Sequence, residues 1–300
     1  YNRAQRLVFE QSSPNGILLF KETSKIVCSY GNVLVNSQAF RSATANTLSA
    51  GDPYKIAYKG ASLCMNVLTT ALSGGYVNFG VFKLYGDKSL DNALEIVLKI
   101  SLSIPLTDVL SYPKLAKAYY TFFEIIFRNH LSIVLLMDSS VFAQIMTAIH
   151  EGLQSIDAPL SAQCAIAIDH LATFMFQKGA KSTPEALSLK AHIQNNPNLL
   201  SSLISTLFNI LLFDNASSQT ANQWACTRPI LSLLLADESA FNQYKEHIVA
   251  GQSKENAARL TECFDKLLAD IQRNLDNSNR DRFTQRLTVF RVSARQFLTF

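Results

Sequence analysis

Apolar residues recur at helical spacing along most of the chain. Residues 254–275 carry Leu260, Phe264, Leu267 and Ile271 on one stripe, and residues 279–297 repeat the same four-three rhythm. Such a stripe is typical of an amphipathic helix that packs one face on a core. Further helices are predicted by the same pattern. They cover residues 14–36, 52–72, 87–103, 113–126, 138–153, 157–176, 197–213, 224–236 and 238–250.

The segment of residues 73–87 is the densest aromatic run between glycines. Tyr76, Phe79, Phe82 and Tyr85 recur every three residues, which on a helix spreads the rings over half of the circumference. We therefore expect a helix that touches two neighbours, as an inner helix of a stacked array does. Aromatic packing is the favoured interpretation over a ligand cage.

Three stretches with little periodic hydrophobicity are predicted to be loops. They are residues 37–52, 177–196 and 214–223, with a short helix over residues 185–192 inside the second. Alternating apolar and polar residues flanked by hairpin dipeptides are not found, so no strand is predicted. The chain is expected to be all-α.

The predicted helices number about twelve and pair at a spacing near 40 to 50 residues, which matches the helix-pair period of HEAT and armadillo arrays. We therefore expect residues 1–300 to form one continuous right-handed α-solenoid of HEAT-type antiparallel helix pairs. This prediction depends on element counting, since the repeats show no clear self-similarity. A globular helical bundle is the alternative architecture.

Composition supports a well-buried chain. Hydrophobic residues make up 48% and charged residues 17%, and the net charge of +4 is too small to indicate a nucleic-acid surface. The five cysteines are far apart without a CxxC pair, which favours reduced core residues in a cytosolic or nuclear compartment. Residues 199–213 are apolar but short and interrupted by polar residues, so a buried helix is expected rather than a membrane span. The start at Tyr1, without methionine, suggests a piece of a longer chain.

Catalytic and cofactor-binding patterns are absent from the sequence. GxSxG, HExxH and phosphate-binding glycine loops are not present, and neither metal nor cofactor is expected. His150 beside Glu151 and Asp169 beside His170 project about 100° apart on a helix, so each histidine is interpreted as a polar rim residue. Trp224 is interpreted as core packing at a helix start rather than as a partner contact. The chain is expected not to be an enzyme.

A cluster of arginines near the end of the chain has two interpretations. Arg280, Arg282 and Arg286, with three further arginines nearby, could bind an anionic partner. The alternative is the polar outer face that a terminal repeat needs, and this second interpretation is slightly favoured.

Several stretches of the sequence are more specific than a periodic pattern, because each is a string of particular residues and not only a spacing of apolar positions. They run in order along nearly the whole chain: Asn15-Gly-Ile-Leu-Leu-Phe, Gly75 through Asp87, Leu90-Asp-Asn-Ala-Leu, Tyr112-Pro-Lys-Leu, Gln223-Trp, Arg228-Pro, and Asn279-Arg-Asp-Arg-Phe-Thr-Gln. In these strings the chain resembles the carboxy-terminal part of the exportin-7 family, within the importin-β superfamily of nuclear transport receptors.

This resemblance implies a HEAT-repeat fold and a role in nuclear export. It implies binding of Ran-GTP, chiefly through amino-terminal repeats that this chain lacks, binding of a protein cargo and of phenylalanine-glycine nucleoporins, and shuttling between nucleus and cytoplasm through the nuclear pore. A nucleotide-independent cytosolic scaffold is the competing hypothesis. Within the aromatic segment, Tyr76, Asn78 and Lys83 are the residues considered for cargo contact, with packing as the favoured role.

Overall fold

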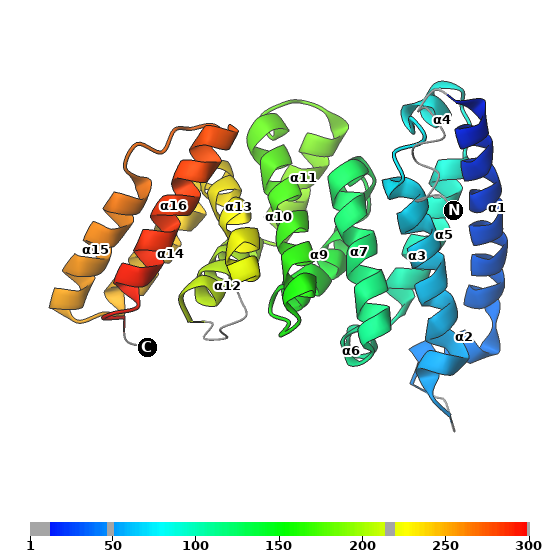
Figure 1. Ribbon diagram of the computed structural model, residues 1–300, viewed down its shortest axis with the longest axis horizontal. Helices are drawn as coiled ribbons and strands as arrows, with labels where there is room; N and C mark the ends of the chain where they lie inside the picture. The colour runs from blue at the N-terminus through cyan, green and yellow to red at the C-terminus, as the bar shows by residue number, and fades with distance from the viewer. Residues whose placement is uncertain (1–12, 47–50, 214–219, 299–300) are drawn as a thin grey trace. The chain divides into compact units, whose positions relative to one another are not determined.

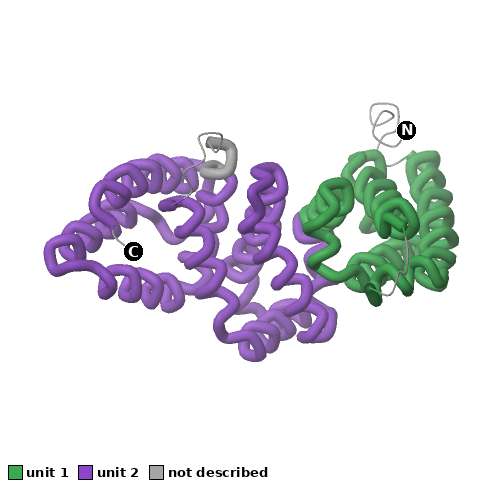
Figure 2. The backbone as a smooth tube through the Cα atoms, turned by 90° about the horizontal axis from the view of Figure 1, so that it is seen from below, with its two compact units in different colours: residues 1–125 green, residues 126–300 purple. Residues whose placement is uncertain are grey.

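The computed structural model describes residues 13–46, 51–213 and 220–298, with side chains left out of the description for residues 220–224. These residues form sixteen α-helices and one π-helical turn, and contain no strand (Figure 1). The predicted all-α class is confirmed. The chain divides into two compact units, residues 1–125 and 126–300, shown in Figure 2. The boundary falls within helix α7 (Pro113–Asn129).

The first unit is built around one long helix, α1. Ser13 caps its start with its hydroxyl, Pro14 occupies the first turn, and Phe20, Val27 and Leu34 are buried along one face. Helices α3 and α5 pack on α1 and on each other. The elements before α7 are α1 (Pro14–Asn36), α2 (Gln38–Thr44), the π-helical turn η2 (Tyr54–Tyr58), α3 (Lys59–Ser73), α4 (Gly80–Leu84), α5 (Ser89–Ser103) and α6 (Leu106–Ser111).

The second unit consists of helices that pack on sequence neighbours and on helices further along the chain. Helix α9 packs on α10, α12 on α13, and α15 on α16, while the most extensive pairing joins α10 to α13. Adjacent helices that form pairs, with one pair packed on the next as α10 packs on α13, fit HEAT-type repeats. The elements are α8 (Leu131–Leu135), α9 (Ser139–Leu153), α10 (Ala158–Lys178), α11 (Pro184–Asn195), α12 (Leu199–Phe213), α13 (Thr220–Ala236), α14 (Glu238–Ala250), α15 (Lys254–Leu268) and α16 (Asn277–Ala294).

An aromatic cluster forms the core at the carboxy-terminal end of this unit. Phe208 of α12 contacts the rings of Phe241, Tyr244, Phe264 and Phe290, with centroid distances between 4.8 and 6.2 Å. These rings come from α12, α14, α15 and α16. One side chain therefore ties four helices together, and α12 is the buried helix that its apolar sequence predicted.

The prediction of a helix over residues 73–87 is wrong. Apart from Ser73, which ends α3, only Gly80–Leu84 is helical, and the residues between them form an irregular turn. Gly75 has φ +68°, a left-handed conformation that side chains other than glycine adopt rarely, and it breaks the path from α3. The Asn78 side chain then accepts a hydrogen bond from the backbone N–H of Gly80, 3.1 Å away, as the chain enters α4.

Two further boundaries differ from the sequence prediction. Residues 38–44, expected in a loop, form α2, because the Ser37 hydroxyl accepts the N–H of Phe40 and the Phe40 ring is buried. Helix α15 ends at Leu268 instead of Leu275, and Asp270 follows it with φ +55°. The short helix expected within residues 177–196 is confirmed as α11, but it covers Pro184–Asn195, so most of this stretch is helical instead of the predicted loop.

Some predictions are not decided by these residues. The Trp224 side chain and residues 214–219 of the third predicted loop lie outside the described part of the chain, whereas residues 220–223 of that loop form the start of an α-helix instead. The right-handed superhelix and the single continuous segment over residues 1–300 stay predictions. Four helices of seven residues or fewer, α2, α4, α6 and α8, account for the difference from the expected count of about twelve.

Candidate functional site

Tyr76, the first residue considered for cargo contact, lies inside the first unit. It is 1% exposed, and α1 approaches it so closely that a Cβ on Gly16 would lie 2.5 Å from the Tyr76 carbonyl oxygen. Its hydroxyl has no hydrogen-bond partner, and burial raises the pKa of Tyr76 to about 12. This placement supports packing as the role of Tyr76.

Asn78 and Lys83 lie on the surface of the same segment. Both are exposed, while the rings between and beside them turn inward: Phe79 and Phe82 pack edge-on against Phe20 at 4.9 and 5.2 Å. The buried rings fix the segment on α1 and leave these two polar side chains accessible. Partner binding by Asn78 and Lys83 stays a prediction.

An ion pair anchors the end of this segment to α1. The Asp87 carboxylate lies 2.7 Å from the ammonium of Lys21 and accepts the backbone N–H of Ser89 at 2.8 Å. The hydrogen bond from Lys21, aided by the bonds from Ser89, lowers the pKa of Asp87 to about 2. Asp87 is therefore ionised at neutral pH and holds the start of α5 near α1.

Arg280 has an internal partner. Its guanidinium lies 3.0 Å from the carboxylate of Asp169 and donates to Thr173 Oγ1 at 3.2 Å. Asp169 also accepts a hydrogen bond from the hydroxyl of Ser232. The Arg280 and Asp169 side chains are only 12% and 13% exposed. The sequence places Asp169 beside His170 but gives no sign of this pairing, because the partner is 111 residues away.

Arg282 and Arg286 reach back to the end of α15. Arg282 donates to the carbonyl oxygen of Asp270 at 2.9 Å. Arg286 donates to the carbonyl oxygens of Lys266, at 3.1 Å, and of Ala269, and pairs with the Asp270 carboxylate at 2.9 Å. The carboxy-terminal carbonyls of a helix lack intrahelical donors and carry partial negative charge, which these guanidinium groups offset.

The three predicted arginines are thus close in sequence but differ in surroundings. Arg280 points into the unit, whereas Arg282 is exposed and Arg286 lies at the edge of a groove. Their binding to an anionic partner stays a prediction, and only Arg282 and Arg286 present charge at the surface.

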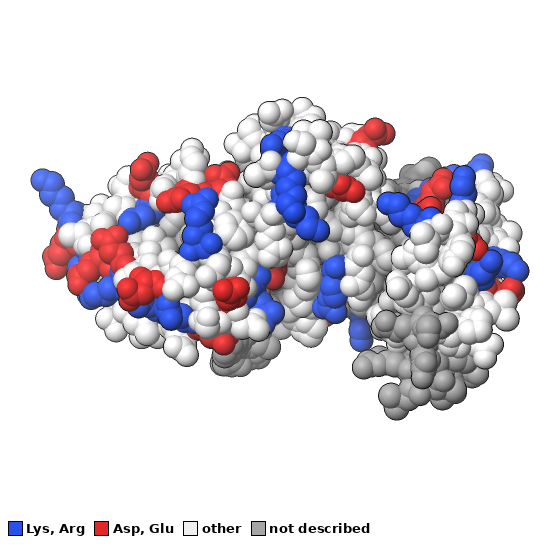
Figure 3. All heavy atoms as spheres, turned by 90° about the horizontal axis from the view of Figure 1, so that it is seen from above, with Lys and Arg blue, Asp and Glu red and all other residues white. Residues whose placement is uncertain are grey.

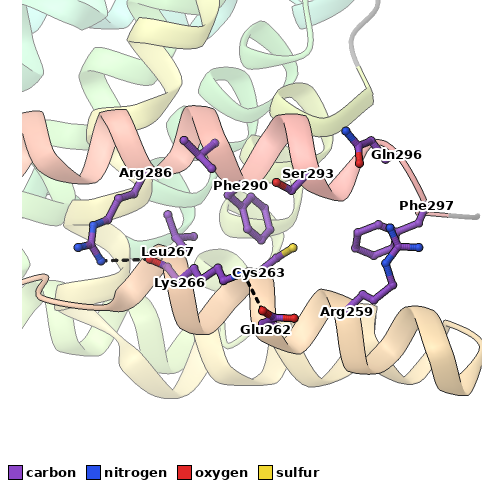
Figure 4. A pocket seen from close by; sticks show the side chains of 11 residues that line it. Arg259, Glu262, Cys263, Lys266, Leu267, Arg286, Phe290, Ser293, Gln296 and Phe297 are labelled. Atoms are coloured by element: carbon purple, nitrogen blue, oxygen red, sulfur yellow. Dashed lines mark hydrogen bonds and ion pairs between the residues drawn. The ribbon is translucent and has the colours of Figure 1, made fainter.

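A groove between α15 and α16 lies near these residues (Figure 4). It has a volume of about 330 Å³, and its apolar lining includes Leu267 and Phe290. At one end the guanidinium of Arg259 lies over the Phe297 ring, 4.3 Å from its centroid. At the rim Lys266 pairs with Glu262 at 2.7 Å, which raises the pKa of Lys266 and lowers that of Glu262. We call this hollow the α15–α16 groove.

The histidines singled out from the sequence hold structural contacts. His150 lies 2.7 Å from the Thr206 hydroxyl, and burial lowers the pKa of His170. Both are half-buried, as expected for rim residues, and Asp169 is engaged by Arg280. No group of three or more metal-ligating side chains occurs among the residues described.

Surface charge and helix length add two observations. On the face in Figure 3, Lys and Arg side chains are interspersed with Asp and Glu, without a large continuous basic area. In the described ranges, no single helix has the length and apolar composition to span a membrane. Helices α11 and α12 satisfy that test only jointly, across a 79° bend, and α12 is buried in the unit.

Comparison with known proteins gives consistent matches over almost the whole chain. It is 40% identical over 299 residues to exportin-7-B of Xenopus laevis, covering 97% of this chain and 26% of the relative. It is 38% identical over 300 residues to Ran-binding protein 17 of Homo sapiens, with the same coverage. Exportin-7 of Dictyostelium discoideum is 28% identical over 292 residues, covering 97% of this chain and 28% of that protein. No protein-family model and no solved structure matches.

The sequentially packed helix pairs define an α-helical repeat protein of HEAT type, the architecture expected of a nuclear transport receptor segment. With these matches, the chain belongs to the exportin-7 family and corresponds to a carboxy-terminal part of its relatives. It spans about a quarter of the length of the curated relatives it matches.

Proposed function

We propose that this chain is the carboxy-terminal part of a nuclear export receptor, which binds a protein cargo together with Ran in its GTP form and carries it through the nuclear pore. The observation that carries the proposal is the 40% identity to exportin-7-B over 97% of the chain. The names of the related Ran-binding proteins 16 and 17 support Ran as the partner. The receptor shuttles between nucleus and cytoplasm and contacts phenylalanine-glycine nucleoporins on the way.

The proposed mechanism needs binding and no covalent chemistry, so the protein is not an enzyme. Units built of neighbouring helix pairs change curvature at a modest cost per interface, because each pair contacts only its neighbours. Ran-GTP and cargo would each favour the same curvature. Each ligand then raises the affinity for the other, and the coupling is reciprocal.

Surface residues of this part of the chain are proposed to take part in cargo contact. Asn78 and Lys83 are exposed on the aromatic segment, Arg282 is exposed on α16, and Arg286 lines the α15–α16 groove. The buried Tyr76 and the ion-paired Arg280 would act indirectly, by holding the surfaces that carry the others.

The decisive experiment measures cargo capture by the full-length protein. Immobilised receptor is exposed to a nuclear extract with Ran loaded with GTP, with Ran loaded with GDP, or without Ran, and bound proteins are identified by mass spectrometry. Export function predicts a set of proteins retained only with Ran-GTP. Equal retention in all three arms would overturn the proposal in favour of a nucleotide-independent scaffold.

A further inference from the structure

A second hollow lies in the first unit, where η2 meets the start of α7. Its walls include the rings of Tyr54 and Tyr112, which are stacked with centroids 5.8 Å apart and planes 29° from parallel. Pro113 extends the apolar lining, and the volume is about 510 Å³. We call this hollow the Tyr54–Tyr112 cleft.

Neighbouring contacts hold the aromatic walls in place. The Asp52 carboxylate accepts the backbone N–H of Tyr54 at 3.0 Å. The buried Tyr58 ring packs on Tyr112, with centroids 5.8 Å apart, and its hydroxyl donates to the Asp108 carboxylate at 2.5 Å. A wall supported in this way loses little conformational freedom when a ligand binds, so the cleft is preorganised.

Three lysines surround the cleft without ion-pair partners. Lys55, Lys59 and Lys114 line it, are exposed, and form no salt bridge with any of the described residues. Among the residues that the structure describes, Asp52 alone adds an acidic side chain to the lining. Elsewhere in the chain, Lys21, Lys25, Lys245 and Lys266 are paired with carboxylates. The cleft thus combines a net positive charge with an aromatic surface.

We propose that the Tyr54–Tyr112 cleft binds an acidic peptide segment of a partner protein, whose aromatic or aliphatic side chain lies against the two tyrosine rings while its carboxylates face the lysines. Charge complementarity selects the acidic partner, and the apolar wall selects a segment with one large hydrophobic anchor. Nucleic acid fits less well, because it requires basic residues along an extended face. The inference does not depend on the proposed transport function.

A direct binding experiment tests the cleft without Ran or cargo. A fluorescent glutamate-rich peptide with one tryptophan is titrated against the whole chain and followed by fluorescence anisotropy. Two matched peptides replace either the tryptophan with serine or the glutamates with glutamine. Both are expected to bind more weakly than the first. Raising the ionic strength from about 0.1 M to about 1 M shortens the screening length from ~10 Å to ~3 Å and should weaken the first peptide strongly.

Variants of residues that line the cleft connect binding to it. Lys55→Glu, Lys59→Glu and Lys114→Glu are each expected to weaken the peptide about threefold to tenfold, because each reverses one charge at the ligand. Tyr54→Phe retains the ring and should bind nearly as well as the parent, whereas Tyr54→Ala should lose about tenfold. Lys99→Glu is the matched control, since Lys99 is an exposed lysine on α5 outside the cleft lining.

Three results would overturn the inference. One is failure of the parent chain to bind the acidic tryptophan peptide. Another is an equal loss of binding in Lys99→Glu and in the three cleft variants, at unchanged thermal stability. The third is that a single-stranded RNA oligonucleotide binds tightly and the peptide does not. If the cleft lysine substitutions abolish that RNA binding, the cleft is assigned to nucleic acid.

Discussion

The guanidinium of Arg280 lies 3.0 Å from the carboxylate of Asp169, and this pair joins α16 to α10 inside the second unit. Thr173 and Ser232 complete the network with hydrogen bonds. Every charged group in it has a partner, so removing one partner leaves the other charge poorly solvated.

Asp169→Asn is therefore expected to lower the free energy of unfolding by about 2 to 4 kcal/mol, because the largely buried Arg280 loses its counter-charge. Chemical denaturation followed by circular dichroism measures the change. Lys266→Gln serves as the control, since it removes a pair whose lysine and glutamate are 72% and 65% exposed and should leave stability unchanged. A loss no larger in Asp169→Asn than in the control would contradict a structural role for Arg280.

Two substitutions at Tyr76 separate its ring from its hydroxyl. Tyr76→Phe is expected to be neutral or slightly stabilising, by up to about 1 kcal/mol, because the buried hydroxyl has no hydrogen-bond partner. Tyr76→Ala should cost about 3 to 5 kcal/mol through the cavity it leaves. Thermal melts of both variants test the pair of expectations. If Tyr76 contacted cargo through its hydroxyl, Tyr76→Phe would instead bind cargo more weakly in a capture assay while keeping full stability.

Ionisation of Tyr76 makes the free energy of unfolding depend on pH. Its pKa is raised from 10.0 to about 12 in the folded chain, so its contribution to stability is complete below pH 10 and is lost as pH rises from 10 towards 12. Tyr76→Phe lacks this group. The stability of the variant relative to the parent should therefore increase over that window, which denaturation curves at several alkaline pH values would measure.

The Asp87 carboxyl makes the stability depend on pH in the acidic range. Its pKa falls from 3.8 to about 2 on folding, so its contribution is complete above pH 4 and is lost as pH falls towards 2. The Lys21 side chain is 40% exposed, and solvent screening limits the effect to about 1 kcal/mol. Asp87→Asn should show this loss at neutral pH and a flatter acid profile. Equal acid profiles of variant and parent would exclude Asp87 as the titrating group.

The periodic helices were predictable because packing dominates them. In α16, Phe283, Leu287, Phe290 and Ala294 are buried as their four-three spacing indicated. The aromatic segment was not predictable in this way. Its three-residue period suggested a helix, but the left-handed Gly75 and the side-chain hydrogen bond from Gly80 to Asn78 produce a turn. Local backbone conformation prevailed over hydrophobic spacing there.

The candidate binding surfaces were likewise predictable from the sequence only in part. An arginine cluster was visible in the sequence, yet the sequence could not reveal that Arg280 pairs with Asp169, because tertiary packing brings residues 111 positions apart together. The Tyr54–Tyr112 cleft was missed for the same reason. Its tyrosines and lysines come from two segments more than fifty residues apart, and neither segment alone carries a binding motif.

Arg286 provides the sharpest test of whether the terminal arginines serve the fold or a partner. It donates to the last carbonyl oxygens of α15 and pairs with Asp270, so Arg286→Gln should loosen the end of that helix. Hydrogen exchange is expected to rise in residues 266–270 and stay unchanged in the buried α12. Arg282→Gln is the comparison, because Arg282 is exposed and makes one carbonyl contact.

Cargo binding by the two variants separates the two roles of Arg286. A purely structural role predicts that Arg286→Gln binds cargo normally once the temperature is lowered to restore the helix end. A contact role predicts weak binding of both variants at every temperature. Unchanged exchange in Arg286→Gln together with lost capture would show that the guanidinium acts on the partner rather than on α15.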